Sequence, residues 1–162
     1  MWSLLFLFLI LLSAALILSF TVGRWRSAKD SQKVREAALG YIDDLERRYE
    51  EFVRKRLTLA YVKEEEWPAH QEDLVKEAKE MVKPDIDALA AFIAGFPFRI
   101  APSTHPPSVF RNLKNTAEEL LSRNMKRQVN GIRELLYRDF EDAARADLKN
   151  RWLDYQVGER FR

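Results

Sequence analysis

The two histidines are the residues of this chain best suited to metal or proton-transfer chemistry. His70 and His105 stand 35 positions apart on different predicted segments. A tetrahedral zinc site would need Asp or Glu for its remaining ligands, and no ligand spacing around either histidine indicates one. A di-iron bundle needs Glu-x-x-His motifs on two helices, and Trp67 occupies the glutamate position before His70. We therefore predict no metal site and no cofactor.

Other catalytic signatures are also missing from the sequence. The chain has no cysteine, which excludes disulfides, thiolate ligands and cysteine nucleophiles. It has no glycine-rich phosphate loop, no Gly-x-Ser-x-Gly turn and no His-Glu-x-x-His pair. Acidic runs such as Asp43-Asp44, Glu64-Glu65-Glu66 and Glu118-Glu119 are typical of solvated helix faces, because adjacent side chains on a helix point apart. The sequence therefore predicts a protein that is not an enzyme.

The N-terminal segment, residues 1–23, contains no charged side chain, and residues 4–22 are almost entirely apolar. About 20 apolar residues at ~1.5 Å per residue span the ~30 Å hydrocarbon core of a bilayer. We therefore predict a transmembrane anchor over 1–23. The alternative is a cleavable signal peptide with a cleavage pattern at Thr21-Val22-Gly23. Against it, no Lys or Arg precedes the apolar run, and the run exceeds the roughly 7–15 residues typical of signal peptides.

A basic cluster follows the anchor directly. We place Arg24, Trp25, Arg26 and Lys29 at the membrane interface. Because Lys and Arg lie on one flank of the span alone, the rest of the chain is expected on the positive-inside face. That face is the cytoplasmic side of a bacterial inner membrane or the matrix side of a mitochondrial one. The cluster would also attract anionic lipids by about 1 kcal/mol per charge, although an ordinary stop signal for the span is the simpler explanation.

Charges of both signs fill the remainder of the chain. Lys and Arg total 27 and Asp and Glu total 25, for a net charge of +2. A nucleic-acid-binding protein usually shows an excess of positive charge on one face, so we expect no nucleic-acid partner. The alternation in residues 46–51 is typical of solvated helices with ion pairs between neighbouring turns.

Residues 24–66 are predicted to form a juxtamembrane amphipathic helix or stalk, ~65 Å long at ~1.5 Å per residue. Its apolar positions recur at steps of three and four. A coiled coil is indicated only weakly, because Arg56 and Lys63 fall on or near the apolar seam. We expect the helix to end at Trp67-Pro68, since the residue before a proline disfavours the helical conformation.

Residues 67–107 are predicted to contain two short helices and a proline-rich loop. Pro84 stops or kinks the first helix, and Gly95 ends the second. The apolar stretch 86–94 is too short to span a bilayer, which indicates a buried core helix. The alternative is a shallow insertion into the membrane surface through Phe92, Phe96 and Phe98.

Four prolines make the segment from Phe96 to Pro107 non-helical and extended. The simpler interpretation is a connector across the end of the bundle. The alternative, which does not exclude the first, is a docking loop, because loops on rigid scaffolds often carry binding sites. Tryptophan is enriched in interface hot spots, although a core position is the simpler explanation for each tryptophan. The residues predicted as possible partner contacts are Phe96, Phe98, His105, Trp67 and Trp152.

Residues 108–162 are predicted to form a long C-terminal helical segment. A capping box at Thr116–Glu119 indicates a helix start, and Asn130-Gly131 either divides the segment or weakens one helix. Helices 27–66 and 114–155 are expected to pack antiparallel, with the helices of 70–94 laid across them. The predicted fold is all-α: one N-terminal transmembrane helix followed by a small helical bundle.

These features favour a non-catalytic, single-pass membrane protein that acts as an accessory, assembly or scaffold subunit. Its expected partner is another protein or a second copy of the chain, and no small-molecule substrate is indicated. One alternative is an exported envelope or periplasmic protein, similar in layout to the phage lysis proteins called spanins, but the basic cluster argues against that orientation. A membrane-bound enzyme with an unrecognised carboxylate site is the third hypothesis.

Overall fold

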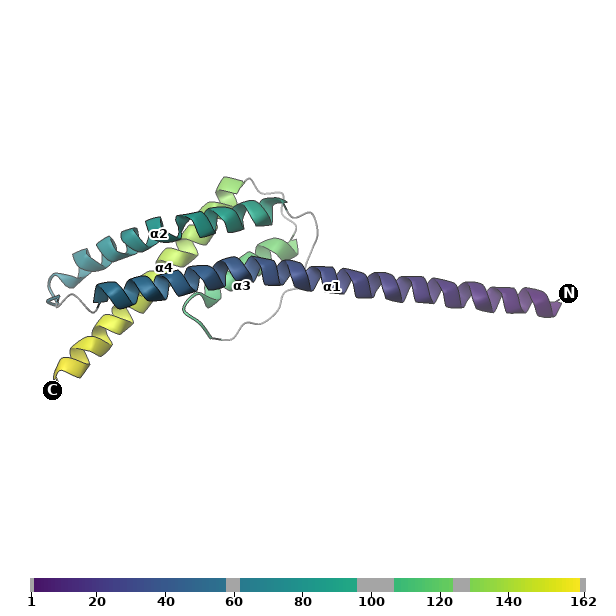
Figure 1. Cartoon of the computed structure of the whole chain (residues 1–162), viewed down its shortest axis with the longest axis horizontal. Helices are drawn as coiled ribbons and strands as arrows, with labels where there is room; N and C mark the ends of the chain where they lie inside the picture. Colours follow the sequence, from purple (N-terminus) through teal and green to yellow (C-terminus); the bar gives the residue numbers. More distant parts are fainter. Residues whose placement is uncertain (1, 58–61, 96–106, 124–128, 161–162) are drawn as a thin grey trace. The chain divides into compact units, whose positions relative to one another are not determined.

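The computed structural model describes residues 2–57, 62–95, 107–123 and 129–160, and these ranges contain helices and no strand. The four helices are α1 (Trp2–Leu57), α2 (Trp67–Gly95), α3 (Arg111–Arg123) and α4 (Val129–Arg160) (Figure 1). The all-α prediction and the helical bundle are therefore confirmed.

The chain divides into two compact units, residues 1–36 and 37–162. The first unit is the N-terminal part of α1, and the second is a bundle formed by the remainder of α1 together with α2, α3 and α4. Where side chains are described, no helix is both long and apolar enough to cross a membrane. The structure thus gives the transmembrane helix no support. The predicted anchor, 1–23, and the interface residues Arg24, Trp25, Arg26 and Lys29 lie outside the described side chains.

Helix α2 runs antiparallel to the C-terminal part of α1. As residue numbers fall along α1 they rise along α2, which is the signature of a helical hairpin. Three contacts establish this register: Arg56–Glu77 at 2.9 Å, Arg48–Asp85 at 3.4 Å and the rings of Tyr41 and Phe92 with centroids 5.9 Å apart.

Helix α4 also runs antiparallel to α2, so α1 and α4 are parallel to each other. The α2–α4 register is given by the ion pairs Glu72–Arg145, Lys79–Glu141 and Asp87–Arg133. The expectation that the two long helices pack antiparallel is therefore wrong. The direction of α3 explains the difference. Phe110 contacts Tyr49, and Lys114 pairs with Asp43 and Glu46, so α3 runs antiparallel to α1. The turn from α3 to α4 then gives α4 the same direction as α1.

Pro84 and Pro68 do not end helices where the sequence analysis predicts helix ends. Pro84 lies inside α2, which continues to Gly95 as one helix rather than two. A proline inside a helix costs ~3 kcal/mol, but Val82, Ile86 and Leu89 are buried on the same helix, and such tertiary packing is what stabilises most helices in proteins. Pro68 begins a helix instead of ending one, since the fixed φ of proline suits the first helical turn.

The C-terminal helices also begin elsewhere than predicted. α3 starts at Arg111, and Thr116 is not a cap: its Oγ1 donates a hydrogen bond to Asp139 of α4 at 2.5 Å. The division between α3 and α4 falls between Arg123 and Val129, which places Asn130-Gly131 in the first turn of α4.

Each helix contributes one apolar stripe to the bundle core. In α4 the buried row repeats at every fourth residue, as a helix face requires. The apolar positions Ala38, Ile42, Leu45 and Tyr49 of α1 are likewise buried against helices of the same chain, whereas Phe52 is half-buried. The buried residues on these two stripes are Ala38, Ile42, Leu45, Tyr49 and Val53 of α1 and Ile132, Leu136, Phe140, Ala144, Leu148 and Trp152 of α4.

Candidate functional site

The two tryptophans predicted as partner contacts stack on each other inside the bundle. Trp67 begins α2 and Trp152 lies on α4, with ring centroids 4.8 Å apart and planes 10° from parallel. They are 5% and 8% exposed, and the indole of Trp152 donates to the carbonyl of Val62 at 3.4 Å. The geometry favours the core interpretation. Phe96, Phe98 and His105 lie outside the described residues.

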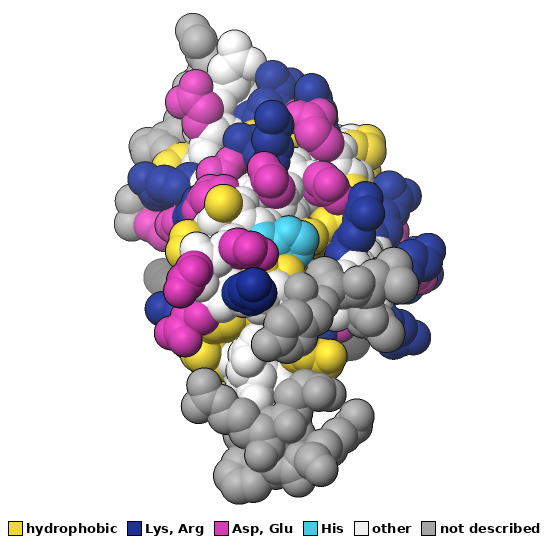
Figure 2. Space-filling model, turned by 90° about the vertical axis from the view of Figure 1, so that its left-hand side faces the viewer, with side chains coloured by type: hydrophobic (Ala, Val, Ile, Leu, Met, Phe, Trp, Pro, Cys, Tyr) yellow, Lys and Arg dark blue, Asp and Glu magenta, His cyan; other side chains and the backbone are white. Residues whose placement is uncertain are grey.

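His70 lies in the first turn of α2, with its ring 6.1 Å from that of Trp67. The Nε2 of His70 and the Nε1 of Trp67 are buried without a hydrogen-bond partner among the described residues. Among all the residues that the structure describes, no group of three or more His, Cys, Asp or Glu is placed to hold a metal ion. Figure 2 shows this end of the molecule, where acidic and basic side chains are interspersed with a few hydrophobic ones.

Tyr49 lies at the centre of the bundle and joins α1 to α4. Its hydroxyl donates to Asp147 Oδ2 at 3.0 Å and to the carbonyl oxygen of Ala144 at 3.3 Å. Asp147 also accepts a hydrogen bond from Arg151 Nε at 2.7 Å, and Arg151 pairs with Glu50 of α1. A fully buried phenol is thus connected to a chain of charges that reaches the surface.

The electrostatics of this network favour a structural role. Burial raises the pKa of the Tyr49 hydroxyl well above its ordinary value, and the negative charge of Asp147 adds to the effect. Burial would lower the pKa of Arg151, but its bonds to Glu50 and Asp147 outweigh this and raise it. Tyr49 therefore stays protonated at neutral pH, where it donates hydrogen bonds and is unsuited to act as a nucleophile or base.

Two aromatic rings pack around Tyr49. Phe110 lies edge-on to Tyr49 at 5.1 Å and stacks on Phe140 at 5.2 Å. Both phenylalanines are fully buried. Sequence analysis missed Phe110 because it precedes α3 and follows the proline-rich segment. Its spacing from Leu113 and Ala117, which are also buried, is the helical signal that would have found it.

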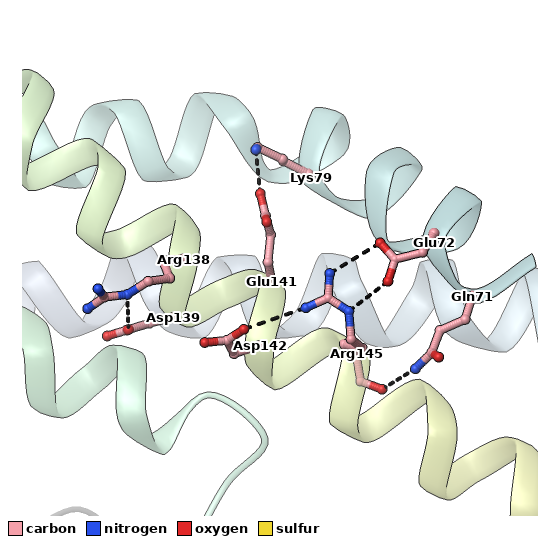
Figure 3. A network of polar contacts seen from close by, with 8 residues as sticks. All are labelled: Gln71, Glu72, Lys79, Arg138, Asp139, Glu141, Asp142 and Arg145. Carbon is pink, nitrogen blue, oxygen red and sulfur yellow. Dashed lines mark hydrogen bonds and ion pairs between the residues drawn. The ribbon is translucent and has the colours of Figure 1, made fainter. Parts of the chain in front are cut away.

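A second polar network joins α2 to α4 across the surface (Figure 3). Arg145 binds both carboxylate oxygens of Glu72, at 2.8 and 3.2 Å, and its backbone carbonyl accepts from Gln71 at 2.6 Å. The hydrogen bond from Arg145 holds the pKa of the Glu72 carboxyl below its usual range. Nearby, Lys79 pairs with Glu141.

Tyr137 of α4 belongs to the second polar network. Lys79 Nζ lies 5.1 Å above its ring, and its hydroxyl is 3.5 Å from Asp87. Burial, followed by the charge of Asp87, raises the pKa of Tyr137 to about 12. The second phenol is therefore also a neutral donor at physiological pH.

The acidic run at Asp43-Asp44 is ion-paired. Lys114 Nζ bridges Asp43 at 2.8 Å and Glu46 at 3.3 Å, which ties α3 to α1. Asp44 pairs with Arg47 one turn along α1, at 2.8 Å. This pairing matches the expectation of solvated, ion-paired faces.

Leu153 and Tyr155 are large hydrophobic residues that the described part of the chain leaves exposed, at 43% and 46%. Both follow Trp152 near the end of α4. They do not belong to the row of buried residues that repeats at every fourth position of α4 and ends at Trp152, so their exposure could have been predicted from the sequence. They add a candidate contact surface that sequence analysis did not single out.

Comparison with known proteins assigns the bundle to no family. No protein-family model matches the chain, and no curated protein or solved structure matches it. Its function is therefore inferred from the sequence and from the geometry of the bundle.

Proposed function

We propose that this chain is a non-catalytic, single-pass membrane protein whose helical bundle acts as an accessory, assembly or scaffold subunit through contacts with another protein. The observation that carries the proposal is the uncharged segment 1–23. From Trp2 onward this segment belongs to helix α1. A helix satisfies its backbone hydrogen bonds internally, which a single segment crossing hydrocarbon requires.

The orientation rests on the charges that follow the segment. The segment itself contains no Lys or Arg, whereas Arg24, Arg26 and Lys29 follow it within a few residues. The positive-inside tendency then leaves the bundle on the cytoplasmic or matrix face. Anchoring confines the bundle to a thin layer beside the membrane, which raises its effective concentration for a partner in the same membrane.

The ionisable groups of the bundle support a structural role. The two described tyrosines with strongly shifted pKa values are protonated at neutral pH. The arginines Arg145 and Arg151 connect helices rather than converge on one point. Contacts with a partner are best sought at the exposed Leu153 and Tyr155 of α4 and at the predicted contacts Phe96, Phe98 and His105.

Photo-crosslinking in native membranes tests the proposal. A photoreactive residue is placed at Leu153, at Tyr155 or at Phe98 of the full-length, C-terminally tagged chain, and at exposed Lys76 of α2 as a matched control. After mild-detergent purification, mass spectrometry identifies the adducts. We expect one reproducible protein partner, in stoichiometric amount, from at least one test position and not from Lys76. Recovery of the chain alone, or only as a homo-oligomer, would contradict the proposal.

A further inference from the structure

The outward side of α4, near its C-terminal end (Figure 1), carries a heptad repeat that the bundle core does not use. Its positions follow one another at steps of four, three and four residues, which are the steps between the a and d positions of a coiled coil. Where their side chains are described, these positions are exposed. In the order d, a, d, a the residues are Ala146, Asn150, Leu153 and Val157, and we call them the outer stripe.

The residue types of the outer stripe are those of a parallel coiled coil of two strands. A β-branched residue at a together with leucine at d, as at Val157 and Leu153, favours two strands. A single asparagine at an a position, here Asn150, specifies the register and the number of strands. Leu153 is 43% exposed, although the described part of the chain leaves few large hydrophobic side chains exposed. The outer stripe therefore combines apolar contact area with an amide that sets the register.

Two unpaired charges flank the outer stripe. Lys149 occupies a g position, and Asp154 occupies the e position five residues later. Both are exposed, and neither forms an ion pair with any residue that the structure describes. They do not face each other, because residues five apart lie about 140° apart around a helix. The preceding g and e residues, Asp142 and Asp147, already pair with arginines of α4. Lys149 and Asp154 thus remain available to another chain.

We propose that the outer stripe binds the outer stripe of a second copy of this chain, as a parallel two-stranded coiled coil. In that arrangement each g residue faces the e residue of the following heptad on the other helix. Lys149 of one copy then meets Asp154 of the partner subunit, and symmetry makes this pair twice. In an antiparallel arrangement g faces g and e faces e, so like charges would meet. The flanking charges therefore select the parallel dimer.

The inference goes beyond the proposed function and does not rest on it, because the outer stripe belongs to the bundle and not to segment 1–23. Buried Leu148 and Trp152 hold this part of α4 in the bundle before association, which reduces the conformational entropy lost on binding. The stripe is short, so its interface is at the small end of specific interfaces and the dimer should dissociate on dilution. Tyr155 lies about 200° around the helix from Leu153, outside this interface.

Exchange of the flanking charges tests the pairing. Lys149→Glu and Asp154→Lys each bring like charges together in a dimer, whereas the double variant restores opposite charges. Lys76→Glu, which reverses an exposed charge on α2, is the control. Sedimentation equilibrium of the full-length chain in density-matched mild detergent gives the dissociation constant of the dimer. We expect this constant to rise about tenfold for each single reversal, because two pairs are lost, and to return to its original value in the double variant. Lys76→Glu should leave it unchanged.

Cysteine crosslinking locates the contact independently. Because the chain has no cysteine, Leu153→Cys or Tyr155→Cys introduces a single thiol. The two positions are similarly exposed, at 43% and 46%, and Leu153 alone belongs to the outer stripe. Oxidation of the full-length chain should give a disulfide-linked dimer from position 153 and little from position 155.

Four results would overturn the inference. The chain could stay monomeric at every concentration, or its dissociation constant could be the same after either charge reversal. Crosslinking could be equally efficient at positions 153 and 155, which would place the contact elsewhere. The double variant could remain as weak as the single ones, which would show that Lys149 and Asp154 do not face each other. None of these results bears on the anchor, so the proposed function is tested separately.

Discussion

The bundle is held together in two different ways at its two main seams. Around Tyr49, where α1 meets α4, aromatic rings are fully buried and one phenol is satisfied by Asp147 and a carbonyl. Between α2 and α4, by contrast, partly exposed pairs such as Glu72–Arg145 carry most of the polar contacts. Buried aromatic area contributes far more free energy than a solvated ion pair. The buried rings around Tyr49 therefore stabilise the fold, as does the Trp67–Trp152 stack between α2 and α4, while the partly exposed ion pairs fix the register of α2 against α4.

The largest effect is expected from removing a ring at the buried seam. Phe140→Ala deletes the ring that stacks on Phe110 and should lower the free energy of unfolding by about 3–5 kcal/mol. Denaturant unfolding of the full-length chain in mild detergent, followed by circular dichroism, measures this loss. Leu153→Ala, at an exposed position of the same helix, is the control and should cost less than about 1 kcal/mol. Equal losses in the two variants would contradict the comparison.

A single hydroxyl at each seam gives a finer comparison. Tyr49→Phe removes a buried donor and leaves the Ala144 carbonyl without it, so we expect a loss of about 1–3 kcal/mol. Tyr137→Phe removes a partly exposed hydroxyl that is 3.5 Å from Asp87, and its effect should be smaller. The same denaturant unfolding measurement compares the two losses of unfolding free energy. A larger loss for Tyr137→Phe than for Tyr49→Phe would show that the α2–α4 seam is the more tightly packed one.

The raised pKa values predict a loss of stability at alkaline pH. An unfolded tyrosine ionises near pH 10, and both Tyr49 and Tyr137 ionise above that value in the bundle. Their contribution to stability is therefore complete below about pH 10 and is lost as the pH rises, for Tyr137 between about 10 and about 12. Unfolding free energies measured from pH 8 to 12 should fall less steeply for Tyr49→Phe than for the unaltered chain. An unchanged slope would place the Tyr49 hydroxyl in water.

The smallest effect is expected at the exposed ion pair. Arg145→Ala should cost no more than about 1 kcal/mol, and the loss should shrink as salt screens the pair. A double-mutant cycle with Glu72→Ala isolates the pair from the remaining contacts of each residue. A coupling energy well above about 1 kcal/mol that is independent of salt would mean that this ion pair also stabilises the fold.

Helical periodicity was sufficient to predict the fold class and the core. The buried row from Ile132 to Trp152 repeats at every fourth position, so it can be read directly from the sequence. Helix ends were harder to predict. Pro84 and Pro68 have the same local conformational preferences. Nevertheless α2 continues past Pro84, because Val82 and Ile86 on either side of it are buried, whereas Pro68 lies in the first turn of α2. The conformational preferences of the residues next to each proline do not predict this difference.

The candidate site was less predictable than the fold. The stacking of Trp67 on Trp152 and the bond from Tyr49 to Asp147 join residues far apart in the chain, and no local pattern encodes such a pairing. Parallel packing of α1 and α4 depends on the direction of α3, which the apolar pattern does not specify.

Membrane fractionation combined with cysteine labelling tests the central claim, an anchored bundle on the positive-inside face. Asn150→Cys places one thiol at an exposed position of α4 in a chain that otherwise has none. The account predicts that the full-length protein stays in the membrane pellet at alkaline pH. It also predicts that a membrane-impermeant maleimide labels the thiol only after the membrane is permeabilised. Release into the supernatant would contradict the anchor, and labelling in intact cells would contradict the orientation.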